Sequence, residues 1–155
     1  MNIGLIVYSW SGNTLSVAEK LKAALIKAGH TATLEQVTLV GERKQGDRSF
    51  EIDHAPDPSA YDAVIFGSAV EAFSLSPVLS AYLKRLGSLE GKKVGCLVSQ
   101  QFPYAWMGGN RAVRQMKALC KAKGGSIAGS GVVHWAKAKR ETSTDVVVKR
   151  LVGAF

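Results

Sequence analysis

The chain has 155 residues, of which 46% are apolar, and a formal net charge of +8. This length and composition predict one globular domain spanning residues 1–155, with little room for a second one. The first residues, MNIGLIVYSW, lack the basic region and the cleavage site of a secretion signal, and no apolar stretch approaches the roughly 20 residues of a membrane span. We therefore expect a cytoplasmic protein that does not bind membranes.

Apolar periodicity divides the chain into alternating strands and helices. Residues 2–8 form a short apolar run, which predicts a buried strand, and the apolar positions from 13 to 28 have helical spacing and end at Gly29. In chain order, strands are then expected at 30–39, 62–68, 92–99 and within 126–136, and helices at 77–86, 111–124 and about 144–152. Residues 40–60 are charged and contain proline, so we expect a long connection there, with a short turn near 58–61.

Strands that alternate with helices and are almost continuously apolar are typical of a parallel sheet covered on both faces. The expected fold class is therefore α/β, a single doubly wound sheet of five parallel strands with helices on both faces. Ligands of such sheets bind at the carboxyl ends of the strands, where the strand order reverses. The loops after the first, third and fourth strands are the candidates for a functional site.

The segment YSWSGNT, residues 8–14, joins the first strand to the first helix and is rich in hydrogen-bonding groups. A helix start is the simplest interpretation, but one Ser, Thr or Asn is enough for a cap. Free N–H groups at a helix N-terminus also bind phosphate, and the additional hydroxyls suit that purpose. No Lys or Arg precedes Lys20. We therefore expect a phosphate monoester, because nothing nearby provides for more charge, held by neutral donors.

The segment lacks the residues that other ligands and other protein classes need at this position. GxxxxGK[ST] and GxGxxG are both absent, which argues against ATP and against a dinucleotide. The segment also has no cysteine for a tyrosine phosphatase and no carboxylate for a phospho-receiver. Cys96 and Cys120 show no CxxC spacing and the three histidines are scattered, so we expect buried free thiols and no metal site.

Aromatic residues and a glycine pair follow the fourth strand, in SQQFPYAWMGGN, residues 99–110. A packed lid is one interpretation of Phe102, Tyr104 and Trp106. Beside a phosphate site, stacking on a flat heterocycle is the favoured one. A phosphate and a flat ring at one edge of the sheet suggest flavin mononucleotide, FMN.

SWSGNT resembles the hydroxyl-x-hydroxyl-Gly-x-Thr phosphate loop of the flavodoxin family. FGSAVEAF and FPYAWMGGN stand where the two ring-binding loops of that family stand. The resemblance covers essentially the whole chain and implies the strand order 2-1-3-4-5 and FMN as the cofactor. Two features depart from the family: electron-carrying flavodoxins are usually acidic, whereas this chain is basic, and many relatives have a proline where this one has Ala69.

Carried over by position, the resemblance gives each of the three loops a part in binding FMN. The first loop would hold the phosphate with Ser9, Trp10, Ser11, Gly12, Asn13 and Thr14. The second would flank one side of the isoalloxazine with Ser68, Ala69, Val70, Glu71, Ala72 and Phe73. The third would supply the other stacking surface with Gln101, Phe102, Tyr104 and Trp106, and would be closed by Gly108, Gly109 and Asn110.

Two of these residues keep alternative interpretations. Trp10 is either a direct contact of the cofactor or only a loop side chain that covers the ribityl chain. Glu71 is either a solvated loop carboxylate or a group close enough to the ring to tune it.

The leading functional hypothesis is a flavodoxin-type electron carrier, because the flavin supplies the redox chemistry and no insert shapes a substrate pocket. The alternative is an NAD(P)H-dependent quinone or small-molecule reductase that uses FMN. From Lys84 to Lys123 there are nine Lys or Arg, and Glu90 is the only acid. The expected partner is therefore an acidic redox protein or NAD(P)H, with the chain as a monomer or homodimer. Nucleic acid is not expected, because no reader motif is present.

Overall fold

The computed structural model describes residues 1–102 and 104–155, so Pro103 of the segment FPYAWMGGN lies outside the described residues. The central sheet contains the parallel strands β1 (Asn2–Val7), β2 (Thr31–Gln36), β5 (Ala63–Glu71), β7 (Lys93–Gln100) and β8 (Ser126–His134). They lie in the order β2-β1-β5-β7-β8, which confirms the expected order 2-1-3-4-5. The β1 and β5 strands are buried over almost their whole length, as their continuous apolar sequence requires.

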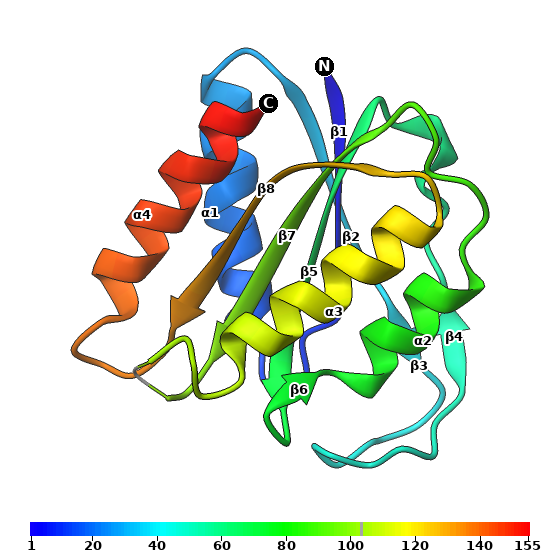
Figure 1. Cartoon of the computed structure of the whole chain (residues 1–155), viewed down its shortest axis with the longest axis vertical. Coiled ribbons are helices and arrows are strands. Elements are labelled where there is room, and N and C mark those ends of the chain that lie inside the picture. The colour runs from blue at the N-terminus through cyan, green and yellow to red at the C-terminus, as the bar shows by residue number, and fades with distance from the viewer. Residues whose placement is uncertain (103) are drawn as a thin grey trace.

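Two helices cover each face of the sheet (Figure 1). The helices α1 (Asn13–Lys27) and α4 (Arg140–Ala154) pack on one face, and α2 (Pro77–Arg85) and α3 (Gly109–Ala122) pack on the other. Each face has its own apolar core: Leu21 and Leu25 of α1 are fully buried on the first, and Met116 of α3 on the second. The expected doubly wound α/β architecture is confirmed.

The structure corrects the expectation for residues 30–60. The expected strand 30–39 is divided at the buried Val37 into β2 and the short β3 (Thr38–Leu39), which leaves the main sheet. The β3 strand pairs antiparallel with β4 (Ile52–His54), inside the segment expected to be an irregular connection. Strands of two and three residues are too short to show a period, which is why the sequence did not reveal them. The turn expected near 58–61 is confirmed as the 3-10 helix η1 (Pro58–Ala60).

Other boundaries also differ from the expected ones, and α3 begins and ends two residues earlier than the expected 111–124. The third central strand does not end at residue 68 but continues to Glu71, and the chain then turns back as β6 (Ser74–Leu75), antiparallel to β5. The last helix begins at Arg140 and not near Thr144, because its first turn, RETS, is polar and carries no apolar period. Cys96 and Cys120 are free and buried, as expected. No helix among the described residues has the length and apolarity to cross a membrane.

Candidate functional site

The loops after β1, β5 and β7 meet at one edge of the sheet, at the lower end of the molecule in Figure 1. The sheet order makes these strands direct neighbours, and their register pairs Val7 with Gly67 and Ala69 with Ser99. The three predicted groups of site residues therefore lie on a common edge, the carboxyl edge at which parallel α/β sheets bind ligands.

The first loop presents a row of backbone donors. Gly12 has a positive φ of 88° and leads directly into α1, which begins at Asn13. The N-cap residue is Gly12, which has no side chain to cap the helix, but the Leu15 N–H of the first turn donates to Ser9 Oγ over 3.2 Å. Within the described part of the chain, the N–H groups of residues 11–14 have no hydrogen-bond acceptor. Unpaired N–H groups at the start of a helix, together with the helix dipole, are a favourable environment for an anion.

Two predicted site residues in this region hold the loop against the sheet. Thr14 is only 1% exposed, and its Oγ1 lies 2.7 Å from Ser99 Oγ at the end of β7. The Ser68 hydroxyl is fully buried and donates to the Tyr8 carbonyl over 3.0 Å. Gly67 makes this packing possible, because a Cβ there would lie 2.9 Å from Val7 Cγ1 and 3.3 Å from Thr14 Cγ2. The Thr14 and Ser68 hydroxyls thus have partners within the protein.

The second loop is a tight and strained hairpin turn. Ala72 and Phe73, which connect β5 to β6, have positive φ values of 50° and 61°. Turns with positive φ at both central residues usually contain Asn and Gly, and each other L-residue in this conformation costs about 1–2 kcal/mol. The turn projects the exposed Phe73 ring, which stacks on Phe102 of the third loop at a centroid distance of 5.4 Å. Strain of this kind is concentrated at binding sites.

Exposed aromatic rings gather in the third loop. The third loop also contains Tyr104 and Trp106, whose rings stack on each other at a centroid distance of 6.1 Å. Trp106 is 74% exposed. A hollow of ≈ 300 Å³ lies between the second and third loops; it is lined by Gln45, Val70, Ala72, Phe73, Gln100, Gln101 and Phe102. This volume lies at the lower end of the range for small-molecule sites.

Buried contacts fix the path of the third loop. The Gln100 side chain donates through Nε2 to the carbonyls of Phe102, at 3.0 Å, and Tyr104, at 2.6 Å. Gly108 has a φ of 113°, and a Cβ on it would lie 2.9 Å from Phe73 Cα. Gly108 and Gly109 are both buried, so the close approach that they permit is to protein atoms, whereas Asn110 is exposed at the start of α3.

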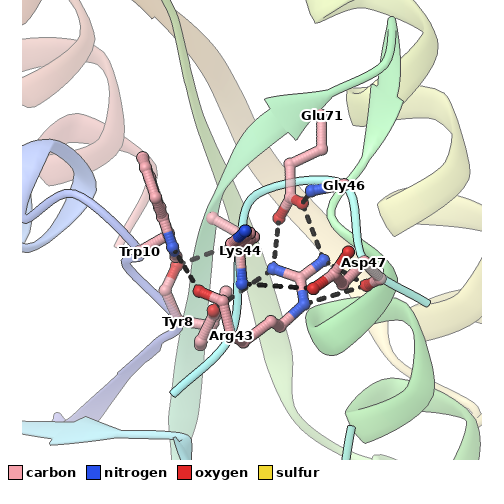
Figure 2. Close-up of polar contacts among 8 residues, drawn as sticks. Tyr8, Trp10, Arg43, Lys44, Gly46, Asp47 and Glu71 are labelled. Carbon is pink, nitrogen blue, oxygen red and sulfur yellow. Dashed lines mark hydrogen bonds and ion pairs between the residues drawn. The ribbon is translucent and has the colours of Figure 1, made fainter. Parts of the chain in front are cut away.

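Glu71 is the predicted site residue whose surroundings differ most from the expectation. The interpretation of a solvated carboxylate is wrong, because Glu71 is only 4% exposed. Its carboxylate faces the Arg43 guanidinium (Figure 2). Its Oε1 accepts from Arg43 Nη2 at 2.8 Å and from the Gly46 N–H at 2.7 Å, and its Oε2 accepts from Arg43 Nη1 at 3.2 Å. Burial alone would raise the pKa of Glu71, but these hydrogen bonds and the Arg43 charge hold the pKa below its ordinary value.

Arg43 joins the 40s loop, defined as residues 41–48, to the first and second loops. Beyond Glu71, its Nη1 donates to the Tyr8 hydroxyl at 3.3 Å, and its Nε and Nη2 both donate to the Asp47 carbonyl. The Arg43 carbonyl accepts the Trp10 Nε1–H at 2.7 Å, which places the indole against the 40s loop, as Figure 2 shows. Trp10 remains 50% exposed.

Sequence reasoning missed Arg43, because it lies 28 residues before Glu71 in a segment without periodicity. No local spacing relates the two side chains. The sequence shows Ser99 and Gln100 as polar residues at the end of an apolar strand. It does not show that their side chains hydrogen-bond to Thr14 and to the third loop.

The sheet order and the carboxyl-edge loops define the class of doubly wound α/β proteins to which flavodoxins belong. The structure is similar to a flavodoxin from Streptococcus pneumoniae (TM-score 0.69, 17% identity, covering 99% of both chains). It is also similar to flavodoxin 2 from Bacillus cereus (TM-score 0.68, 22% identity, 99% of this chain and 97% of that one). A third similar structure is a flavoprotein from Lactobacillus acidophilus in complex with FMN (TM-score 0.63, 16% identity, 94% and 97%).

At the level of sequence, no protein-family model and no curated protein matches the chain. The structural likeness at these identities concerns the fold. The chain therefore has a flavodoxin-like fold, as the resemblance implied.

Proposed function

We propose that this protein binds FMN at the carboxyl edge of its sheet and carries electrons in the manner of a flavodoxin. The observation that carries the proposal is the juxtaposition of two features at that edge. The unpaired N–H groups of residues 11–14 suit a phosphate, and the exposed aromatic rings of the second and third loops suit a flat ring. FMN combines both chemical groups in one molecule.

The first loop would bind the phosphate mainly through its backbone. Hydrogen bonds to a charged oxygen are each worth ~1.5–3 kcal/mol, and four N–H groups have no acceptor there. The neutral side-chain donors are Ser9, Ser11 and Asn13, because Ser9 Oγ only accepts from the Leu15 N–H and keeps its own O–H, whereas the Thr14 hydroxyl is paired with Ser99. Arg43 is close by, but Glu71 neutralises it, so the charge of the ligand is met by N–H dipoles.

Phe73 and Phe102 would bind the ring. They lie in contact, with their planes 7° apart. A flavin between them needs about 7 Å between the two ring planes, twice the ~3.5 Å of a stacked contact. The third loop would therefore move away from the hairpin when the ring enters, or the ring would stack on the outer pair formed by Tyr104 and Trp106.

FMN would supply the redox chemistry, while the chain positions the ring and limits its contact with water. A specific observation favours a carrier over a reductase. The hairpin turn consists of only Ala72 and Phe73, and Gly108 packs directly on it, so no inserted segment shapes a substrate pocket at this point.

Reconstitution with FMN followed by two assays tests this proposal. The flavin, reduced photochemically by two electrons, should be reoxidised by two equivalents of a one-electron acceptor such as ferricyanide. The same protein should oxidise NADH and NADPH no faster than free FMN does when a quinone is the acceptor. Rapid, saturable NAD(P)H oxidation would contradict the carrier and support the reductase instead.

A further inference from the structure

A groove of ≈ 660 Å³ runs along β8, between α3 and α4. The β8 strand pairs only with β7 and is therefore an edge of the sheet, with α4 and α3 on its two sides in Figure 1. The floor of the groove includes Ser130 and Val132, and its walls carry Arg114 and Lys117 from α3 and Arg150 from α4.

The groove is lined by positive charge without compensating carboxylates. The sequences of α3, GNRAVRQMKALCKA, and of β8, SIAGSGVVH, contain no acidic residue. The acids of α4, Glu141 and Asp145, are not among the residues that line the groove. The one ion pair between side chains in the described residues joins Arg43 to Glu71, so Arg114, Lys117 and Arg150 are without a carboxylate partner. An anionic ligand would be attracted to this surface.

The floor of the groove also offers free backbone groups. Trp135 donates its N–H to the Gln100 carbonyl of β7, so Ser130, Val132 and His134, which alternate with it, direct their backbone groups away from the sheet. The His134 N–H donates to Ser143 Oγ at 3.0 Å, and the Ser130 carbonyl accepts from Arg150 at 3.3 Å. Among the described residues, the Val132 N–H and carbonyl have no partner, because β8 pairs with β7 alone and these groups face the open side. Unpaired groups on an edge strand are a template for another strand.

We propose that this groove binds an extended acidic segment of a partner protein, which pairs with β8 at Val132. Its carboxylates would lie between the α3 wall, at Arg114 and Lys117, and the α4 wall, at Arg150. Strand addition supplies affinity through main-chain hydrogen bonds, and the charged walls select an acidic sequence.

The chemistry of the groove favours this occupant over two others. A second copy of the chain would bring its own basic groove and a net charge of +8 to the same place, so the two copies would repel each other. Single-stranded nucleic acid is usually held by aromatic residues on which bases stack, and no Phe, Tyr or Trp is among the described residues that line the groove.

The groove reaches the third loop at one end, where Ala105 and Asn110 line it. Lys139 also lines the groove, and its Nζ lies 4.6 Å from the centroid of the Tyr104 ring. A partner bound here would lie beside the aromatic rings, which relates the groove to electron transfer; that relation rests on the proposed function. The binding itself does not require FMN, so failure of either proposal leaves the other standing.

The test measures binding of a fluorescein-labelled oligoglutamate to the full-length protein, with and without added FMN, by anisotropy. Arg114→Gln combined with Lys117→Gln should weaken binding about tenfold, as expected for the loss of two charge contacts. Lys20→Gln combined with Lys27→Gln on α1 changes the net charge equally outside the groove and should leave binding within about twofold. In amide NMR spectra, the Val132 N–H signal should shift on binding.

Two further ligands separate strand addition from attraction by charge alone. An oligoglutamate methylated at alternate backbone nitrogens keeps its charge and should bind about tenfold more weakly. An oligothymidylate of equal charge should bind more weakly than the peptide. The proposal is overturned if the methylated peptide binds equally well, if both double variants weaken binding equally, or if the oligonucleotide binds more tightly.

Discussion

Glu71→Gln tests whether the buried ion pair with Arg43 holds the first loop, the second loop and the 40s loop together. The two side chains are 3% and 2% exposed and lie 2.8 Å apart. In the variant, the Arg43 charge stays buried and keeps only the Tyr8 hydroxyl and the Asp47 carbonyl beside a neutral amide. Removal of one partner from a buried pair costs about 3–5 kcal/mol. The Gln oxygen still accepts from the Gly46 N–H, so we expect a loss of about 3 kcal/mol.

Urea unfolding at neutral pH, followed by circular dichroism, measures this loss. Glu42→Gln is the matched control, because Glu42 is exposed in the same loop, and it should change the free energy of unfolding by less than about 0.5 kcal/mol. A Glu71→Gln variant as stable as the Glu42→Gln variant would show that the ion pair does not hold the loops.

The same pair gives a pH dependence with a defined sign. The pKa of Glu71 is lower in the folded protein than its ordinary value of 4.5, so the unfolded chain binds the proton more readily. The stabilisation is therefore fully present above about pH 4.5 and is lost as the pH falls through the lower folded value. The difference in unfolding free energy between wild type and Glu71→Gln should narrow in that acidic range. A difference that stays constant or widens there would contradict the assigned charge state.

Three other changes test the loops themselves. Gly108→Ala places a Cβ 2.9 Å from Phe73 Cα at a φ of 113°, so it should cost at least about 2 kcal/mol in urea unfolding, whereas Gly87→Ala, with open space around it, should cost little; equal effects would refute the packing argument. Thr14→Val keeps the shape but leaves the buried Ser99 hydroxyl unpaired, so it should lower stability by about 1–2 kcal/mol. Because the Thr14–Ser99 hydrogen bond also holds the first loop and its N–H groups in place, FMN should bind about tenfold more weakly, and unchanged titrations would show that this hydrogen bond is dispensable. Flavin fluorescence should be quenched in the holoprotein and should recover in Tyr104→Leu with Trp106→Leu; persistent quenching that is lost in Trp10→Leu would assign the stacking to the first loop.

Much of the fold followed from the sequence, because buried parallel strands are almost purely apolar and leave a strong signal. The strands predicted at 2–8 and 92–99 agree with β1 and β7 to within one residue at each end. The sequence also indicated which loops would meet, since the sheet order brings the ends of β1, β5 and β7 together.

The contacts within the site could not be predicted from the sequence to the same extent. The distant partners of Glu71 and Thr14 depend on tertiary structure: Arg43 reaches Glu71 from the irregular 40s loop, and Ser99 reaches Thr14 over 85 residues of sequence. The positive φ of Phe73 could not be predicted either, because turns of this kind normally show Asn or Gly.

The central claim is that residues 11–14 bind the phosphate of FMN, and isothermal titration of the protein with FMN and with riboflavin tests it most directly. The two ligands share the ring and differ in the phosphate. Two or more hydrogen bonds from backbone N–H groups to the phosphate should make FMN bind at least roughly a hundredfold more tightly, about 2.7 kcal/mol. Equal affinity for FMN and riboflavin would contradict the account, because the N–H groups at the start of α1 would then contribute nothing to binding.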